Sequence, residues 1–283
     1  RPRHSLRRQP RAAPESPEEP EEHEEHEEQE AMPSLRAHMV FMSALRDALR
    51  GEPPGGDLAP LAAAVDAEWP AALLGSEAPD GWYFSGERRP DTHGLDLEDA
   101  ATWPGAGTRW LQRHPHLSPG RAQRPAVAAF AAGYFSHIGL DTWEQYQHPD
   151  FPAPARDGAP PAWFPPALAA PERRQAALTA LGEAPFPASR LVTPADLLAA
   201  PVPGGFPAEA IRRVAAGVAP ALPLSDSWAI SRVNPLREMP DTSESRVEWE
   251  ARRASQAPAT ADELRALRES ALAFTVDAIR SWW

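Results

Sequence analysis

The chain has 283 residues, which is enough for one large domain or two small ones with a substantial core. It contains no cysteine, so disulfides, thiolate metal sites and cysteine nucleophiles are excluded. Any metal must be held by His, Asp and Glu side chains, a donor set that suits Zn²⁺ in a hydrolytic site. The net charge of −12 argues against a general binder of phosphate backbones, so we expect no stable nucleic-acid binding.

Residues 1–31 are rich in Arg and Pro and end in a run of Glu, PEEPEEHEEHEEQE, with almost no apolar side chains. This composition predicts a disordered acidic tail. No stretch of about 20 apolar residues occurs anywhere, so we predict no transmembrane segment. The first residues also lack the apolar core of a secretory signal, which predicts a cytoplasmic protein. The remaining residues, 32–283, are expected to form a single domain.

The first predicted helix spans residues 34–50, with Ser34 as its N-cap and Gly51 as its stop. His38 lies on the apolar side of this helix. A histidine in such a place is often an ordinary core residue, and a metal ligand is the alternative. A second helical stretch over residues 58–74 should break or bend at Pro70.

Two polar residues follow in predicted loops. Asp80 comes after a proline and before Gly81-Trp82, in an expected turn against large aromatic side chains. His93 follows thirteen residues later, at the end of a short polar loop. A helix interrupted near Pro104 is expected over residues 95–113. It is followed by two histidines in a Pro- and Gly-containing segment, which we interpret as surface loop residues, His114 and His116.

The most informative stretch is residues 122–150, an Ala-rich segment that predicts one long helix opened by Pro125. His137 and Asp141 are four residues apart, so they lie one turn apart on the same helix face. Glu144 and His148 return to roughly that face. Apolar neighbours flank the stripe, so its polar groups must be paired or metal-bound. A hydrogen-bonded His–Asp pair in a helical core remains the simpler alternative.

The rest of the chain predicts further helices after a proline-rich loop over residues 151–171. Residues 193–196 and 260–263 have the pattern of capping boxes, and residues 260–283 carry an apolar stripe at helical spacing. No strand-like alternation occurs, so the predicted fold class is all-α.

The order and spacing of these residues resemble the zinc-dependent phospholipase C family, which is related to the P1-type nucleases. The resemblance covers residues 32–150 and rests on His38, the Pro79-Asp80 pair, His93 and the segment GYFSHIGLD. It implies a multi-helix bundle with a metal site between helices and a zinc-activated water that cleaves phosphoester bonds. The implied substrate is a small-molecule or lipid phosphoester.

Carried over to this chain, the resemblance implies six metal ligands: His38, Asp80, His93, His137, Asp141 and His148. Asp80 would also be the catalytic general base. His38 would contact a second metal, with Asp141 bridging the two.

Two departures from the family favour one zinc ion over two or three. No histidine follows His148, so a second H-x-x-x-E pair is missing. The N-terminal Trp that supplies a ligand in the family's secreted members is also missing. Glu144 is a spare candidate ligand on the same helix face.

The sequence therefore supports three hypotheses. The first is a metal-dependent hydrolase of phosphoesters. The second is a non-catalytic metal-binding helical module with a degenerate site. The third is a helical interaction protein in which the His and Asp side chains are ordinary core pairs.

Overall fold

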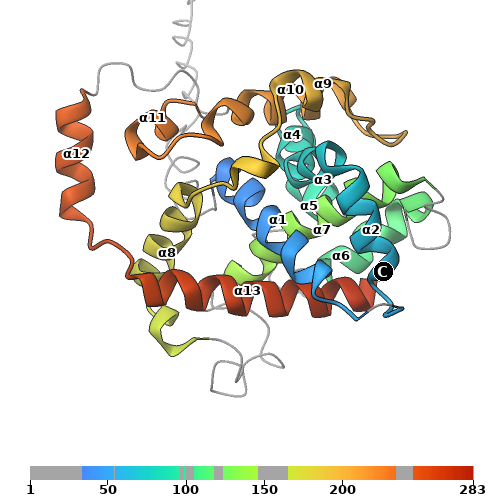
Figure 1. Cartoon of the computed structure of the whole chain (residues 1–283), viewed down its shortest axis with the longest axis horizontal. Coiled ribbons are helices and arrows are strands. Elements are labelled where there is room, and N and C mark those ends of the chain that lie inside the picture. The colour runs from blue at the N-terminus through green and yellow to red at the C-terminus, as the bar shows by residue number, and fades with distance from the viewer. Residues whose placement is uncertain are drawn as a thin grey trace, which may run out of the picture. The chain divides into compact units, whose positions relative to one another are not determined.

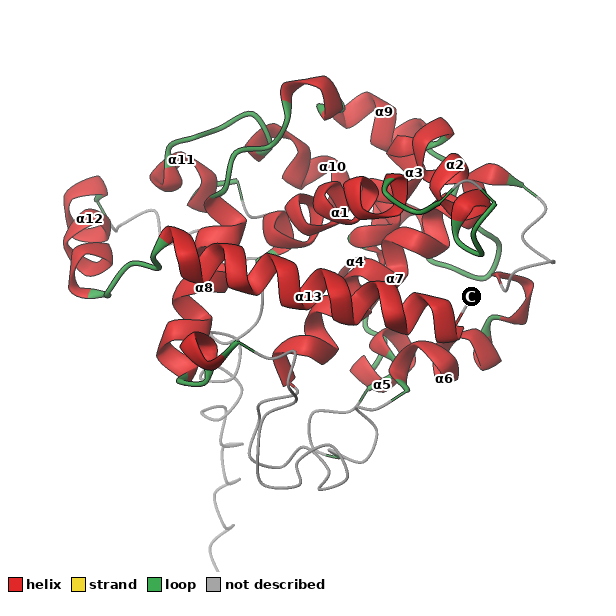
Figure 2. Ribbon diagram, turned by 60° about the horizontal axis from the view of Figure 1, so that its bottom comes forward, coloured by secondary structure: helices red, strands yellow, loops and turns green. Residues whose placement is uncertain are grey.

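The computed structural model describes residues 34–53, 55–95, 99, 105–117, 124–145, 165–233 and 245–282. All of them belong to one compact unit, residues 33–283. Within these ranges the regular structure is entirely helical and contains no strand (Figure 2), which confirms the all-α prediction. Three predicted features lie outside the described residues: the tail, residues 151–164 of the proline-rich loop predicted over residues 151–171, and His148.

The α-helices, in chain order, are α1 (Leu35–Arg50), α2 (Ala59–Ala67), α3 (Trp69–Ser76), α4 (Ala78–Tyr83), α5 (Arg89–His93), α6 (Ala106–Arg113), α7 (Pro125–Gln145), α8 (Pro171–Glu183), α9 (Pro194–Ala199), α10 (Ala208–Val218), α11 (Ser227–Ser231), α12 (Arg246–Ser255) and α13 (Ala261–Trp282). Four short 3₁₀ segments accompany them: η3 (Pro115–Leu117), η5 (Pro166–Leu168), η6 (Ala188–Arg190) and η7 (Ala219–Ala221). None of the described helices is long and apolar enough to cross a membrane.

Helix α7 is the centre of the packing. It contacts α3, α2, α13 and α1, and α13 lies across both α1 and α7 (Figure 1). Every residue from Ala128 to Gln145 is buried, so α7 is covered around its whole circumference. Such a helix has no face exposed to solvent, so its His and Asp side chains must find partners inside the protein.

A pair of glycines lets α3 and α7 approach closely. A Cβ atom added to Gly133 of α7 would overlap the carbonyl oxygen of Ala72 and lie 2.7 Å from the backbone nitrogen of Ser76. A Cβ atom added to Gly75 of α3 would overlap the carbonyl oxygen of Phe130. Glycine is therefore required on both sides of this crossing, and the crossing fixes the distance between Ser76 and the polar residues of α7.

Arg36 is a buried cation on α1 whose role the sequence did not reveal. Its guanidinium donates to the carbonyl oxygens of Ala184 (2.9 Å), Ala221 (3.0 Å) and Leu222 (3.1 Å). These acceptors lie in segments far along the chain, so a single side chain links α1 to the C-terminal half.

Several predicted boundaries are correct. Ser34 caps α1, and Pro125 opens α7. The capping boxes at Thr193 and Thr260 form through Asp196 and Glu263, respectively. A third capping box, between Ser245 and Glu248, opens α12.

The loop predictions before α6 are wrong in two places. Asp80 lies inside α4, where Pro79 occupies the first turn and starts the helix. His93 is the last residue of α5, which ends at a left-handed Gly94. The break expected at Pro70 falls at Glu68 instead, because Pro70 is tolerated in the first turn of α3. Leu95 and Asp99 are not helical, and α6 begins only at Ala106.

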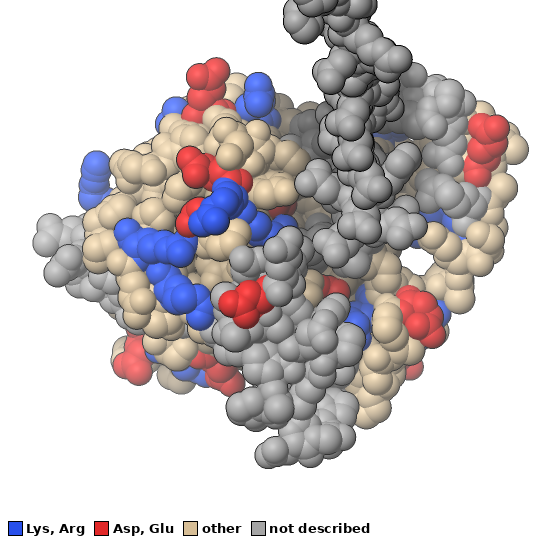
Figure 3. Space-filling model, turned by 180° about the vertical axis from the view of Figure 1, so that it is seen from behind, with Lys and Arg blue, Asp and Glu red and all other residues tan. Residues whose placement is uncertain are grey.

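Acidic and basic side chains lie side by side on the described part of the face that Figure 3 shows. Ion pairs among the described residues include Arg113–Asp91 (3.1 Å) and Arg253–Glu183 (2.8 Å). These pairs are at least partly exposed, so each contributes little to the free energy of unfolding.

We expect the substitution Gly133→Ala to destabilise the protein by about 2–3 kcal/mol, because the new methyl group would push α3 away from α7. Alanine in place of glycine normally stabilises a helix interior by about 1 kcal/mol, so the expected sign is opposite to that of helix propensity. Urea denaturation followed by circular dichroism measures the change.

Gly204→Ala is the matched control, because a Cβ atom there has no neighbour within 4 Å. A Gly133→Ala protein as stable as the wild type would show that the close crossing of α3 and α7 does not exist in solution.

Candidate metal centre

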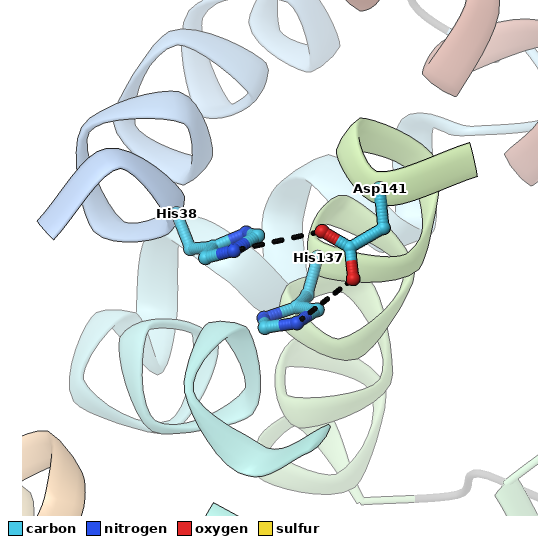
Figure 4. Close-up of side chains that lie close together, drawn as sticks. All are labelled: His38, His137 and Asp141. Atoms are coloured by element: carbon cyan, nitrogen blue, oxygen red, sulfur yellow. Dashed lines mark ion pairs between the residues drawn. The ribbon is translucent and has the colours of Figure 1, made fainter. Parts of the chain in front are cut away.

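Five of the six predicted ligands converge on one buried point between four helices. Figure 4 shows three of them, with His38 of α1 facing His137 and Asp141 of α7. The five are His38, Asp80, His93, His137 and Asp141. The sixth, His148, lies outside the described residues.

His137 lies at the middle of the group. Its Nε2 atom is 3.5 Å from Oδ2 of Asp141 and 3.9 Å from Oδ1 of Asp80. Its Nδ1 atom is 2.7 Å from the carbonyl oxygen of Ser76. A carbonyl oxygen can only accept, so Nδ1 carries the proton and donates. The Nε2 atom is therefore left to face the two carboxylates, which is the usual tautomer of a metal-binding histidine.

His93 is held in a similar way. Its Nε2 atom is 3.3 Å from Oδ1 of Asp80 and 3.8 Å from Oδ2 of Asp141. Its Nδ1 atom is 2.7 Å from the hydroxyl oxygen of Thr92. The buried hydroxyl of Tyr134 donates to the carbonyl oxygen of Thr92, so this neighbour is itself fixed by α7.

His38 contributes a ring without hydrogen bonds. The ring stacks on that of His137, with centroids 3.6 Å apart and planes 9° from parallel. Its Nε2 atom is 3.7 Å from Oδ1 of Asp141, and neither ring nitrogen has a hydrogen-bond partner. Nε2 of His137 and Oδ1 of Asp141 are likewise buried without a partner.

Buried polar atoms without partners are costly, and native proteins hold few of them. Here several such atoms point at one another. They form two overlapping groups in which one donor atom from each residue lies within 4.8 Å of the others: His38/His137/Asp141 and Asp80/His93/His137. Either group can hold a divalent ion, and a bound ion would satisfy the atoms that the protein leaves unpaired.

The charge states of these five side chains also suit a bound cation. Burial, together with the proximity of His137, lowers the pKa of His38 to about 3. Burial, reinforced by Arg89, lowers that of His93 to about 4. Both rings are neutral at pH 7, as metal ligands must be.

The two carboxyl groups are ionised. Burial acts to raise the pKa of Asp80 and of Asp141. His137, together with the His93 hydrogen bond at Asp80 and Arg89 at Asp141, outweighs burial and lowers both values. The pKa of His137 is raised, because Asp141 and Asp80 outweigh the burial that would lower it. The two carboxylates thus favour positive charge at the position of the His137 ring.

The sequence did not predict the role of Arg89. Its guanidinium donates to Oδ2 of Asp141 at 3.0 Å, and 15% of its side chain is exposed. Asp80, with 14% of its side chain exposed, is the candidate ligand that reaches solvent. The side chains of His93, His137 and Asp141 are fully buried. Among the described residues of the centre, Asp80 and Arg89 therefore have the most exposed side chains.

Two other acidic residues lie near the centre without joining either group of donor atoms. Glu144, the spare candidate, is buried one turn beyond Asp141 and interacts with Arg174 of α8. Burial raises its pKa to about 7. Glu77, which the sequence did not single out, is also fully buried, and burial together with Asp80 raises its pKa well above the ordinary value.

The aromatic residues after Asp80 divide into two kinds. Trp82 packs edge-on against His114 and Phe206, as a core residue does. Tyr83 and Phe84 are 36% and 42% exposed, beside the solvent edge of the centre. His116 is an exposed residue, as predicted, whereas His114 is half-buried against Phe206; neither belongs to the two donor groups.

We expect Glu144→Gln to make the protein more stable at pH 8, with a gain that shrinks as the pH falls. The folded-state pKa of Glu144 is raised from 4.5 to about 7, so folded protein binds more protons than unfolded protein between these values. Glu144 therefore lowers the free energy of unfolding as the pH rises through this window. The gain should level off above pH 7 at no more than about 3 kcal/mol and vanish below pH 4.5.

Urea denaturation at pH 4.5, 6, 7 and 8 measures this difference, and the exposed Glu209→Gln is the control. A Glu144→Gln difference that is the same at every pH would contradict the assignment.

Comparison of the chain with protein-family models, with curated proteins and with solved structures found no significant match. The arguments about function that follow therefore rest on the geometry and chemistry of the buried centre.

Proposed function

We propose that the chain is a zinc-dependent hydrolase that cleaves phosphoester bonds, in phospholipids or in related phosphodiesters. The observation that carries the proposal is the convergence of three histidines and two aspartates on one point, with several inward-facing nitrogen and oxygen atoms left unpaired. The same residues carry the sequence resemblance to the zinc-dependent phospholipase C family.

The spacing of the donor atoms supports zinc. Zn²⁺ binds nitrogen and oxygen at about 2.0–2.2 Å in a tetrahedron, so neighbouring ligand atoms of an ideal site lie roughly 3.3–3.6 Å apart. The distances that join His93 Nε2 and His137 Nε2 to Asp80 Oδ1 and Asp141 Oδ2 are 3.3, 3.8, 3.9 and 3.5 Å. A contraction of a few tenths of an ångström would bring them into this range.

The proposed chemistry assigns separate roles to the residues. The histidines and Asp141 hold the ion, which when bound supplies an activated water at neutral pH. Asp80 is the candidate catalytic residue, because it reaches the solvent edge and its lowered pKa keeps it ionised and able to accept a proton. His137 donates from Nδ1 to the Ser76 carbonyl oxygen, and Nδ1 of His93 is hydrogen-bonded to the Thr92 hydroxyl, so the orientation of both rings is fixed.

The substrate class follows from what borders Asp80. Tyr83 and Phe84, three and four residues after Asp80, are exposed aromatic side chains at the end of α4. They suit an apolar tail or a stacked base equally well. The substrate class that we propose is therefore a phosphoester that carries an apolar or aromatic group.

A non-catalytic metal-binding module is the second candidate. The observation that favours it is the depth of the centre. The side chains of His93, His137 and Asp141 are fully buried, and among the described residues of the centre those of Asp80 and Arg89 are only about one-seventh exposed. Structural zinc sites are closed in this way, whereas catalytic sites keep one position open. The two candidates differ in turnover but agree on metal binding.

Metal content is the first test. We expect purified wild-type protein to contain about one zinc ion per chain by plasma mass spectrometry, and the double variant His137→Ala/Asp141→Ala to contain none. His116→Ala, at an exposed histidine outside both donor groups, should keep the ion. Absence of metal from the wild type, even after zinc is added and the excess removed, would refute the proposal and leave a helical domain with buried polar pairs.

Turnover separates the two candidates. We expect hydrolysis of bis-p-nitrophenyl phosphate by the wild type, and a loss of about 100-fold or more in kcat for Asp80→Asn with zinc still bound, because the amide cannot accept the proton. Normal zinc content with no turnover of model esters, lipids or nucleotides would favour the non-catalytic module.

A further inference from the structure

Arg89 is a cation built into the candidate metal centre. Its guanidinium donates to Oδ2 of Asp141 at 3.0 Å, the same oxygen that lies 3.5 Å from His137 and 3.8 Å from His93. Its neighbour Arg88 points elsewhere, with 78% of its side chain exposed and an ion pair to Asp91. Of these two adjacent arginines, only Arg89 enters the centre.

We propose that Arg89 is the second cation of this site: beside Asp141 it takes the role of an additional metal ion, and it binds the phosphoryl oxygens of the substrate. The proposal rests on the proposed function and extends it. It assigns one metal ion to the centre and gives Arg89 the role of an anion-binding residue.

The first support is the number of available nitrogens. The two donor groups, His38/His137/Asp141 and Asp80/His93/His137, share His137. The Nδ1 atom of His137 is committed to the carbonyl oxygen of Ser76, so only Nε2 can bind an ion. One nitrogen lone pair binds one ion, and therefore both groups cannot be complete at the same time.

The second support is the balance of charge. The three histidines count as neutral ligands and the two aspartates carry −2 together, which one divalent ion cancels. Arg89 then leaves the centre with a surplus of +1, which suits a phosphodiester monoanion. A second divalent ion would raise the surplus to +3 in a buried place, at a large desolvation cost.

Two other buried acidic groups lie near the centre among the described residues. Glu144 interacts with Arg174, which offsets its charge. Burial, together with Asp80, raises the pKa of Glu77 well above its ordinary value, which disfavours a further negative charge beside the centre. Among the described residues the remaining cation at the centre is Arg89.

The third support is the place of Arg89 at the solvent edge. Asp80 and Arg89 are both about one-seventh exposed, while the side chains of His93, His137 and Asp141 behind them are fully buried. Arg89 is therefore a partly exposed cation next to Asp141, where an anion that approaches the ion from solvent can meet it. The planar guanidinium can pair with a phosphoryl oxygen and with Asp141 together, since it has five N–H donors.

Metal stoichiometry tests the first half of the proposal. The full chain, freed of metal by a chelator, is titrated with zinc in a calorimeter. We expect one tightly bound ion in the wild type, in Arg89→Met and in the control Arg88→Met. Two tightly bound ions in the wild type would overturn the assignment of Arg89 as the second cation. No bound ion would overturn the proposed function itself, so the two failures can be told apart.

Anion binding tests the second half. The Co²⁺-loaded protein, whose visible absorption reports the surroundings of the ion, is titrated with inorganic phosphate. We expect Arg89→Met to weaken phosphate binding at least tenfold relative to the wild type. Arg88→Met, which removes the same charge one residue away, should stay within twofold of the wild type.

Arg89→Lys keeps the positive charge and is the control for a general disruption of the structure by the methionine substitution. It should bind phosphate more tightly than Arg89→Met but more weakly than the wild type, because an ammonium group cannot form the paired hydrogen bonds of a guanidinium. Circular dichroism verifies that each variant is folded. Equal phosphate affinities in wild type and Arg89→Met, both with one bound ion, would refute the anion-binding role while leaving the metal centre intact.

Discussion

The electrostatics of two buried aspartates govern this structure. The side chain of Asp141 is withdrawn from water on a helix that is covered on all sides, and Asp80 is nearly so. Ionised carboxylates in such a place need positive charge close by, since their desolvation costs several kcal/mol each. Arg89 supplies part of it, and the raised pKa of His137 shows that the two carboxylates favour positive charge at that ring as well. Helices α1, α4, α5 and α7 each contribute a side chain to this group of charges.

Backbone geometry allows these helices to lie close enough together. The glycines at the crossing of α3 and α7 bring the two helices within backbone contact. The C-terminal end of α3 then lies beside His137, where the Ser76 carbonyl fixes the ring. Both α3 and α4 have a proline in the first turn, so two short helices follow each other directly in the chain. The second of them, α4, places Asp80 at the same point.

Much of the site could be predicted from the sequence, because ligands four residues apart on an apolar helix leave a clear pattern. His137 and Asp141 are such a pair, and the structure places His38, Asp80 and His93 beside them. Arg89 could not be predicted, because it lies among polar residues next to another arginine, and only the tertiary fold decides which of the two turns inward. Glu77 was missed for a related reason: nothing in the local sequence tells a buried glutamate from an exposed one.

The fold class was predictable for a similar reason, while some boundaries were not. Strand-like alternation is a local property, and its absence indicated an all-α chain, as the described residues confirm. The segment around Asp80 was interpreted as a turn because Pro79 and Gly81 usually break helices. In the structure the proline starts α4, and the glycine allows close packing against Ile211 of α10. Tertiary contacts here outweigh local propensity.

The hydrogen bond between His137 and Ser76 has a consequence for the whole domain. Ser76 is the last residue of α3, so the carbonyl that holds the imidazole belongs to the negative end of that helix dipole. The dipole makes the ring a stronger base and orients its free lone pair. A small shift of α3 along α7 would turn the ring and direct this lone pair away from the centre. The affinity that His137 has for a bound cation would therefore depend on how α3 and α7 are aligned at their glycine crossing.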